Sequence, residues 1–391
     1  MFDSINEIST GGIVPSKWLR EAVHDDIISS GKYKIQEANF QPASLDLSLG
    51  EKAYSLVCSF LPLTCSVETK LPELQISEID IRDGAILEKG RAYLIPLLEE
   101  LRLPQGIRAK TNPKSSTGRL DIFTRVITDF SDQFDVITDG YEGRMYLEVF
   151  SRSFTVRVQT GLSLNQLRLF KGDPTCSPGE LQEAHQSKPI LFAAVGQQGQ
   201  LTGPNFDNTI GLSVDLKGTS EGIGFRAKKN SALLDLSRVN HYDPADFWEP
   251  VFADGEERLI LEPEEFYLLS STESVGIPPE FAAEMTAYDT SSGELRTHYA
   301  GFFDPGFGHG EDGRLGGVQP VLEVRAHDVP FMIGPGQKVC TLAFEKMLEA
   351  PEEWYGPKVG SSYQEAGRIL SKHFKPGVST RQLKMFEGRV G

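Results

Sequence analysis

Cysteine and long hydrophobic runs are scarce in this sequence, and their scarcity argues against several classes of protein. The chain has four cysteines in 391 residues and no C-x-x-C pair, which disfavours a disulfide framework or a cysteine zinc cluster and favours free thiols in a reducing compartment. The longest apolar stretches, such as residues 190–195, are far shorter than the roughly 20 residues that cross a bilayer. The N-terminus lacks the basic start and apolar core of a signal peptide. We therefore expect a cytoplasmic protein with no membrane partner.

Positive charge is also in short supply. Lys and Arg number 39 against 55 Asp and Glu, which gives a formal net charge of -16. The resulting field repels polyanions, so we expect no nucleic acid partner. A small anionic ligand would need a local cluster of Lys, Arg and backbone N–H groups, together with a divalent cation that offsets its charge.

Several common catalytic motifs are missing. There is no H-E-x-x-H and no H-x-E followed by P-C-x-x-C, which disfavours a zinc hydrolase or a zinc-dependent nucleobase deaminase. There is no G-x-x-x-x-G-K-[ST] loop, which disfavours a P-loop NTPase. We expect no zinc and no metal ion held at the catalytic site by the protein itself.

Turn-forming residues, in contrast, are abundant. The 38 glycines and 23 prolines separate short segments of alternating or β-branched apolar residues, a pattern typical of antiparallel sheets. The predicted fold class is mainly β with a few short helices. The clearest helix covers about residues 16–30, where Trp18, Leu19 and Ala22 share one face, and a second is expected near residues 363–373.

The chain also repeats itself over a long period. Ordered matches recur at a nearly constant offset: A-S-L-D-L at 43–47 with L-S-V-D-L at 212–216, L-E at 87–88 with L-E at 261–262, Y-L at 93–94 with Y-L at 267–268, and L-E-V at 147–149 with L-E-V at 322–324. Such a series indicates duplication and fusion. We predict two tandem lobes, residues 1–200 and 201–391, joined in the Gln-, Gly- and Pro-rich segment near 199–204.

The run K-S-S-T-G-R at residues 114–119 could bind phosphate because it combines two cations, three hydroxyls and a glycine. Hydroxyl and backbone N–H groups donate to phosphate oxygens, and the Arg119 guanidinium is a planar two-pronged donor. The alternative is a polar turn with a capping serine.

A carboxylate recurs at the same position of a strand-like segment in both halves, as Glu148 and Glu323. Alternation places each glutamate on the face opposite its apolar neighbours. Each could be an ordinary solvent-facing glutamate, but the recurrence favours a functional carboxylate. Ahead of Glu323, the D-P-G-F-G segment at 304–308 is either a structural turn or a rigid mount for Asp304, which could bind a sugar hydroxyl.

In their order along the chain, these motifs resemble the dCTP deaminase family, within the superfamily that contains the trimeric dUTP pyrophosphatases. That family runs from an N-terminal helix to A-x-[LV]-D-[LV]-x-L-G, R-S-S-x-x-R, I-D-P-G-[WY]-x-G, L-E-[FL] and a tail with K-Y-x-x-Q. Residues 43–50, 114–119, 140–143 and 147–148 match in that order, with Lys114 in place of the leading arginine, and Tyr363 and Gln364 resemble the tail.

The resemblance implies two dUTPase-like lobes, each a distorted β-barrel or jelly roll. It implies hydrolytic deamination of dCTP to dUTP and ammonia in pyrimidine deoxynucleotide biosynthesis, without zinc and with Mg²⁺ accompanying the triphosphate. It also implies association into a homo-oligomer.

Each half departs from the family pattern in a different place. In the first half Thr138 stands where the pattern has an aspartate, while the second half keeps Asp304 and Glu323 but has no cation flanking residues 290–295, its counterpart of the phosphate motif. The resemblance implies that, in the family, the phosphate motif of one subunit reaches into a site whose catalytic carboxylate belongs to the neighbouring subunit. We therefore predict one composite site that draws on both halves.

The predicted roles at this site follow the resemblance. Glu323 shuttles protons and Ser115 orients the attacking water. The phosphates are bound by Lys114, Ser116 and Arg119, and the deoxyribose 3′-hydroxyl is bound by Asp304. A tail that contains Tyr363 and Gln364 closes the site. Glu148, the equivalent glutamate of the first half, is the second-copy candidate for the catalytic carboxylate.

Two alternatives stay open. Residues 139–143 also resemble the uracil-excluding hairpin of dUTP pyrophosphatases, so the chain could hydrolyse dUTP or catalyse both reactions in succession. It could also be a regulator that binds a nucleotide without turnover.

Overall fold

The computed structural model describes residues 2–192, 209–218, 222–287, 295–297, 301–309, 316–326, 328–356 and 369–376. Within these ranges the chain is mainly β, which confirms the predicted fold class. The helices are short: α1 (Ser16–His24), α2 (Val67–Leu74), α3 (Ser115–Gly118), α4 (Pro178–Ser187) and three 3-10 helices, Phe2–Glu7, Glu37–Asn39 and Pro244–Asp246. Over the same residues, none of the helices reaches the length and apolarity needed to cross a membrane.

The first lobe is built from two six-stranded antiparallel sheets. The first runs in the order β11 (Val136–Ile137), β9 (Ile107–Pro113), β14 (Ser163–Lys171), β4 (Ser44–Ser48) and β3 (Phe40–Gln41), with β1 (Gly12–Ile13) on β14. The second runs β10 (Ile122–Thr128), β12 (Glu142–Ser151), β8 (Ala92–Arg102), β5 (Lys52–Leu56) and β6 (Gln75–Asp80), with β2 (Ile28–Ser29) on β8. Leu45 and Leu167 from one sheet share a buried core with Ile95 and Leu147 from the other, because alternation turns one face of each strand inward.

The second lobe repeats this plan with shorter strands. One sheet runs β16 (Thr209–Ser213), β28 (Lys338–Lys346), β23 (Phe281–Ala287) and β25 (Phe302–Phe303), and the other β19 (Trp248–Val251), β17 (Gly224–Ala227), β21 (Tyr267–Ser270), β26 (Val321–Ala326) and β24 (Leu295–Thr297). Two further pairs complete it: β20 (Leu259–Leu261) with β27 (Phe331–Ile333), and β15 (Leu191–Phe192) with β22 (Ser274–Val275).

The register of the strands supports the predicted duplication. Glu148 on β12 lies opposite Leu94 on β8, and Glu323 on β26 lies opposite Leu268 on β21. One side-chain contact also repeats: the Glu88 backbone N–H donates to the Tyr93 hydroxyl at 3.0 Å, and the Glu262 N–H donates to the Tyr267 hydroxyl at 3.1 Å. The matching sequence fragments therefore occupy matching positions in two copies of one fold.

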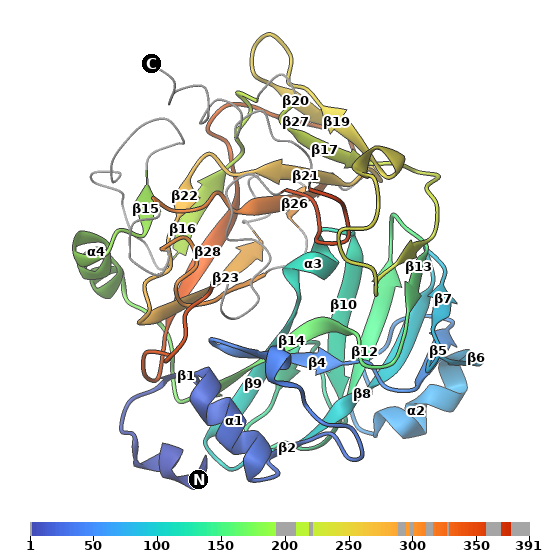
Figure 1. Ribbon diagram of the computed structural model, residues 1–391, viewed down its shortest axis with the longest axis vertical. Helices are drawn as coiled ribbons and strands as arrows, with labels where there is room; N and C mark the ends of the chain where they lie inside the picture. Colours follow the sequence, from blue (N-terminus) through green and yellow to red (C-terminus); the bar gives the residue numbers. More distant parts are fainter. Residues whose placement is uncertain are drawn as a thin grey trace.

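The two lobes pack closely against each other (Figure 1). A three-stranded sheet crosses the junction, in the order β18 (Leu234–Asp235), β13 (Val156–Val158) and β7 (Ala85–Leu87). Beside it, the Phe154 ring of the first lobe lies 5.7 Å from Phe247 and 5.4 Å from Trp248 of the second. Edge-on aromatic contacts of this kind stabilise an interface beyond the area that they bury.

The connection between the lobes packs with the second one. Leu181 of α4 and Leu191 of β15 belong to the core of the second lobe, and β15 pairs with β22. The core therefore changes from the first to the second lobe before α4. The predicted join near 199–204 lies outside the described residues.

The two predicted helices have different outcomes. Helix α1 forms with Trp18, Leu19 and Ala22 buried, but it ends at His24, because Asp26 adopts a left-handed backbone with φ 58° and Ile28–Ser29 joins a sheet as β2. The helix expected near 363–373 does not extend into residues 369–373, which form a turn. The rest of that prediction lies outside the described residues.

A candidate nucleotide site between the two lobes

The phosphate-motif candidate folds as the single-turn helix α3 at the boundary between the lobes, where the first lobe meets β21 and β26 (Figure 1). The Lys114 carbonyl accepts from the backbone N–H groups of Thr117 at 2.8 Å and Gly118 at 3.0 Å, which closes the turn. Ser115 is half-buried, and Ser116 is buried. The Ser115 hydroxyl lies 3.7 Å from where a Cβ on Gly301 of the second lobe would stand.

Glu323 of the second lobe lies directly against this turn. A Cβ placed on Gly118 would stand 2.6 Å from Glu323 Oε1 and 2.8 Å from Cδ, far inside contact distance. Only glycine at position 118 therefore leaves room for the carboxylate where it is. The structure brings together the two motifs that we expected to form a composite site.

The surroundings of Glu323 favour a protonated carboxyl group. The side chain is 7% exposed, and its Oε2 has no hydrogen-bond partner within the described part of the chain. Burial raises the pKa of Glu323 well above its ordinary value, Arg119 opposes that rise and Asp121 adds to it. A carboxyl group whose pKa is raised by a dry site can both donate and recover a proton near neutral pH.

Arg119 is held beside this carboxyl by the C-terminal segment. Its Nη1 donates to the Ile369 carbonyl at 3.0 Å, and the Ser371 hydroxyl donates to the Ser116 carbonyl at 2.8 Å. Residues near the C-terminus therefore already rest on α3. Tyr363 and Gln364 lie outside the described residues, so their predicted place in the tail is not tested.

Lys114 is also engaged, with a carboxylate of its own lobe. Its Nζ forms an ion pair with Asp46, which is 4% exposed and whose Oδ1 has no hydrogen-bond partner among the described residues. Lys372 of the C-terminal segment lies near this pair, and burial, with a further contribution from Lys114, lowers its pKa. A second cation that the sequence interpretation missed thus stands beside the phosphate motif.

Asp304 is paired with a buried arginine that sequence reasoning also missed. The Arg168 Nη2 lies 3.0 Å from Asp304 Oδ1, and its guanidinium lies 3.9 Å from the Phe302 ring centre. Arg168 is fully buried on β14 of the first lobe. Burial raises the pKa of Asp304, and Arg168 opposes that rise. The signal in the sequence was a lone cation in the apolar run L-R-L-F at 167–170.

A second missed pair lies behind Glu323. Asp121 and Arg325 form an ion pair in which the side chains are 0% and 5% exposed. Arg325 follows Glu323 by two residues on β26, so it shares that face of the strand. The Asp121 carboxylate also accepts from the Ser153 hydroxyl at 2.5 Å. This pair ties the strand that carries Glu323 to the end of the α3 turn.

Glu148, the second-copy candidate, has different neighbours. Its Oε1 accepts from Arg125 Nη2 at 2.6 Å and from Nε at 3.1 Å. It faces a cavity of about 640 Å³ on the first lobe. The two equivalent glutamates therefore differ: Arg125 binds Glu148, whereas Glu323 has no ion-pair partner among the described residues.

One group of three possible metal ligands occurs within the described residues, formed by Glu21, His24 and Asp25 at the end of α1. None of the three belongs to the residues around α3 and β26. The donors around α3 are lysine, arginine and serine, which suit phosphate oxygens better than a bare metal ion.

Two lobes of one β-sheet fold bring a buried carboxyl group against a turn of hydroxyls and cations, an arrangement whose donors suit phosphate oxygens. The family model for the 2′-deoxycytidine 5′-triphosphate deaminase N-terminal domain matches residues 10–173, and the model for the C-terminal domain matches residues 177–374. The chain belongs to the 2′-deoxycytidine 5′-triphosphate deaminase family, which confirms the resemblance found in the sequence.

Individual relatives agree with this assignment. The chain is 32% identical to a dUMP-forming dCTP deaminase of Parafrankia sp. (strain EAN1pec) over 151 residues, 36% of this chain and 70% of that protein. It is 32% identical to a dUMP-forming dCTP deaminase of Streptomyces griseus over 162 residues, 39% of this chain and 80% of that protein. The crystal structure of 2′-deoxycytidine 5′-triphosphate deaminase from Agrobacterium tumefaciens is similar over 88% of this chain and all of that chain, with a TM-score of 0.80 and 44% identity.

Proposed function

We propose that this chain deaminates dCTP hydrolytically at a single composite site between its lobes. The observation that supports this most is the position of Glu323, buried, without an ion-pair partner among the described residues and packed on Gly118 of the phosphate motif. Family membership gives the substrate class, and the arrangement of residues suggests which copy of the duplicated glutamate works.

The chemistry requires a group that moves protons in both directions. The protonated Glu323 donates to N3 of cytosine while it takes a proton from the water that adds to C4. It then delivers a proton to the C4 amino group, which leaves as ammonia, and recovers one from the C4 hydroxyl as the carbonyl of uracil forms. Water is consumed and Glu323 ends as it began, which is the role of a general acid and base. In this proposal the Ser115 hydroxyl orients the water.

The triphosphate is held by the first lobe and the C-terminal segment. Lys114, Ser116 and Arg119 bind its oxygens, and Lys372 adds a further cation. The substrate is the Mg²⁺ complex of dCTP, in which the ion offsets phosphate charge, and the chain supplies phosphate ligands instead of a metal cage. Tyr363 and Gln364 close over the phosphates and exclude water.

The deoxyribose is positioned by Asp304. Arg168 occupies Oδ1 of this carboxylate, which leaves Oδ2 to accept from the 3′-hydroxyl. Because Arg168 comes from β14 of the first lobe, the sugar contact also depends on both lobes.

A second candidate reaction follows from the relatives, which are dUMP-forming. In that case the dUTP formed at the site loses pyrophosphate before release. Incubation of the full chain with dCTP and Mg²⁺, with ammonia measured enzymatically and nucleotides separated by chromatography, tests both. Ammonia with dUTP supports deamination alone, and ammonia with dUMP and pyrophosphate supports the coupled reaction. Tight dCTP binding with no ammonia would sink the deaminase proposal and favour a regulator.

We also propose a homo-oligomer in a reducing, cytoplasmic compartment. The four cysteines are free thiols, and Cys58 is exposed. The resemblance to the superfamily of trimeric dUTP pyrophosphatases implies a threefold arrangement of lobes. The two lobes of one chain cannot close such a ring, so we propose that chains associate. Light scattering coupled to size-exclusion chromatography would contradict this proposal by giving the mass of one chain.

A further inference from the structure

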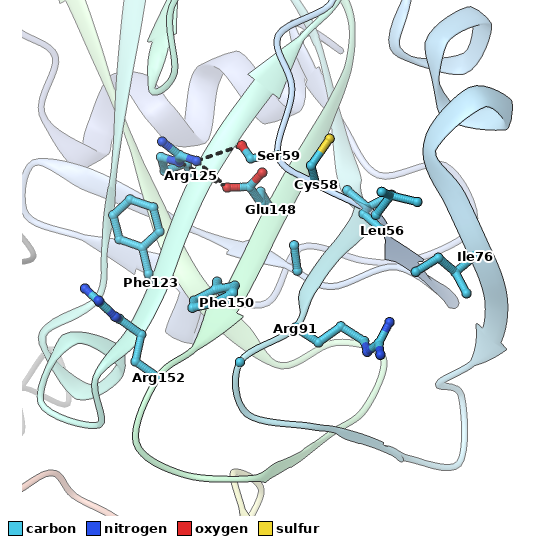
Figure 2. A pocket seen from close by; sticks show the side chains of 13 residues that line it. Leu56, Cys58, Ser59, Ile76, Arg91, Phe123, Arg125, Glu148, Phe150 and Arg152 are labelled. Carbon is cyan, nitrogen blue, oxygen red and sulfur yellow. Dashed lines mark hydrogen bonds and ion pairs between the residues drawn. The ribbon is translucent and has the colours of Figure 1, made fainter. Parts of the chain in front are cut away.

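A cavity beside Glu148 is lined entirely by residues of the first lobe (Figure 2). It measures about 640 Å³ and opens among β5, β8, β10 and β12. Glu148, Arg125, Arg91, Arg152 and Phe123 are among its lining side chains. Its volume lies in the range that encloses a small-molecule ligand.

Glu148 presents an unsatisfied acceptor in this cavity. The side chain is 2% exposed, and its Oε2 has no hydrogen-bond partner within the described residues. A buried polar atom without a partner is costly, so its presence in a cavity indicates a ligand that donates a hydrogen bond there.

Arg125 holds Glu148 in place. Its guanidinium donates to Glu148 Oε1 and to the Ser59 hydroxyl at 2.8 Å (Figure 2). It also lies 3.6 Å from the Phe134 ring centre and 4.6 Å from that of Phe123. Packing between two aromatic rings fixes this arginine. Proton transfer to a carboxylate bound in this way would break the pair, so the cavity is suited to binding and not to deamination.

The remaining charges of the cavity are positive, in a chain whose net charge is -16. Arg91 approaches an acidic group only at 3.8 Å, at Glu88, and within the described residues the Arg152 side chain has no ion-pair partner. With one of the three arginines committed to Glu148, two guanidinium groups remain for an anion. Phe150 adds a half-buried aromatic side chain on which a flat ring can stack.

We propose that this first-lobe cavity is a second nucleotide site that binds without turnover and takes a pyrimidine nucleoside triphosphate. Glu148 Oε2 accepts from a ring N–H or amino group of the base, and Arg91 and Arg152 bind the phosphates. We choose a pyrimidine base because Glu148 and Glu323 occupy equivalent positions in the two copies of the fold. A carboxylate at the position of Glu323 is proposed to meet a pyrimidine, so its equivalent in the first lobe is expected to meet one too.

The cavity also has a route to the composite site. The Arg152 backbone N–H donates to the Asp121 carbonyl at 3.0 Å, and Asp121 pairs with Arg325 on the Glu323 strand. A ligand that draws Arg152 toward its phosphates therefore acts on the residue that anchors that strand.

The test is a count of binding sites per chain in the full-length Glu323→Gln variant, which separates binding from turnover. Calorimetric titration with dCTP and Mg²⁺ should give two sites per chain. Adding Arg91→Ala and Arg152→Ala together should leave one, and adding Arg119→Ala alone should weaken the other. Arg82→Ala, which removes an exposed arginine of the same lobe outside the cavity, should leave two.

Cys58 gives a second readout that does not depend on the stoichiometry. It lines the cavity and is exposed, whereas Cys176 and Cys340 are buried. Saturating dCTP should slow alkylation of Cys58 by iodoacetamide at least tenfold, and inorganic triphosphate should protect less because it lacks a base.

One site per chain in the Glu323→Gln variant, with Cys58 alkylated at the same rate with and without nucleotide, would overturn the proposal. So would an alkylation rate that falls only when chains associate, because a second copy would then cover the cavity. Neither result bears on deamination, since ammonia release by the wild-type chain is measured separately.

Discussion

The carboxyl group of Glu323 occupies the space that a side chain at Gly118 would fill. This contact joins the two lobes where the sequence shows a cation and hydroxyl turn in one half and a recurrent glutamate in the other. It also makes the composite site testable with single substitutions.

Replacing Glu323 by Gln removes the proton shuttle but preserves the shape of the side chain. We expect ammonia release from dCTP to fall by roughly 10²- to 10⁴-fold, the usual contribution of general acid and base catalysis, while dCTP binding persists. The matched control is Glu148→Gln, which should leave the turnover rate within a few-fold of wild type. If Glu148→Gln is the inactive variant, the roles of the two lobes are reversed.

Replacing Gly118 by Ala puts a methyl group where the Glu323 carboxyl lies. The carboxyl is the flexible end of a side chain, so it can move aside and the fold should hold, but its position for catalysis is lost. We expect kcat to fall on the order of 10²-fold with no loss of thermal stability. Gly179→Ala in α4, where a new Cβ meets nothing within 4 Å, is the control and should keep full activity. An active Gly118→Ala enzyme would contradict the assigned role of Glu323.

Arg119→Ala should weaken binding of the triphosphate. Loss of one charge-assisted hydrogen bond costs about 1.5–3 kcal/mol, or roughly 10- to 100-fold in Kd for dCTP. Inhibition by deoxycytidine, which has no phosphates, should change little. An equal loss for nucleoside and nucleotide would show that Arg119 supports the fold through Ile369 instead of binding phosphate.

Arg168→Met should destabilise the lobe junction. Removing this buried cation leaves Asp304 without its partner, and breaking a buried ion pair from one side typically costs about 3–5 kcal/mol. The free energy of unfolding from urea titration measures this cost. The double variant Arg168→Met with Asp304→Asn should recover part of it, because the charge of Asp304 is then gone, while Glu345, which lies 3.6 Å from Arg168, still lacks its partner. No recovery would mean that the pair is not coupled.

Stability should also depend on pH through Glu99. Burial raises the pKa of this carboxyl from 4.5 to about 7 in the folded chain, although its side chain accepts from the Ser48 N–H at 2.8 Å. Between these values the folded state holds a proton that the unfolded state has released, so the stabilisation is complete below pH 4.5 and is lost as the pH rises to about 7. The loss is about 3 kcal/mol.

The measurement compares wild type with Glu99→Gln, which cannot titrate at this position. The unfolding free energy of the wild type minus that of the variant should fall by about 3 kcal/mol as the pH rises from 4.5 to 7. Above pH 7 this difference should stay constant. A difference independent of pH over this window would contradict the raised pKa.

The class of fold and the family could be predicted from the sequence alone. Alternating apolar residues between glycine and proline turns dictate strands, because a strand buries every second side chain. The repeated L-E-V and Y-L fragments were enough to indicate two copies of one fold, and they occupy matching registers in the structure. The order of the motifs then gave the family, since each motif retains the local chemistry of its turn or strand.

Which side chains meet across the lobes depends on the tertiary structure. Arg168 with Asp304, and Asp121 with Arg325, are pairs whose members lie more than a hundred residues apart, so neither periodicity nor spacing links them. The two glutamates look alike in sequence, yet Arg125 binds Glu148 while burial against Gly118 isolates Glu323. A local pattern specifies how a segment folds, whereas the proton affinity and the partner of a side chain depend on the burial and charge that distant segments bring to it.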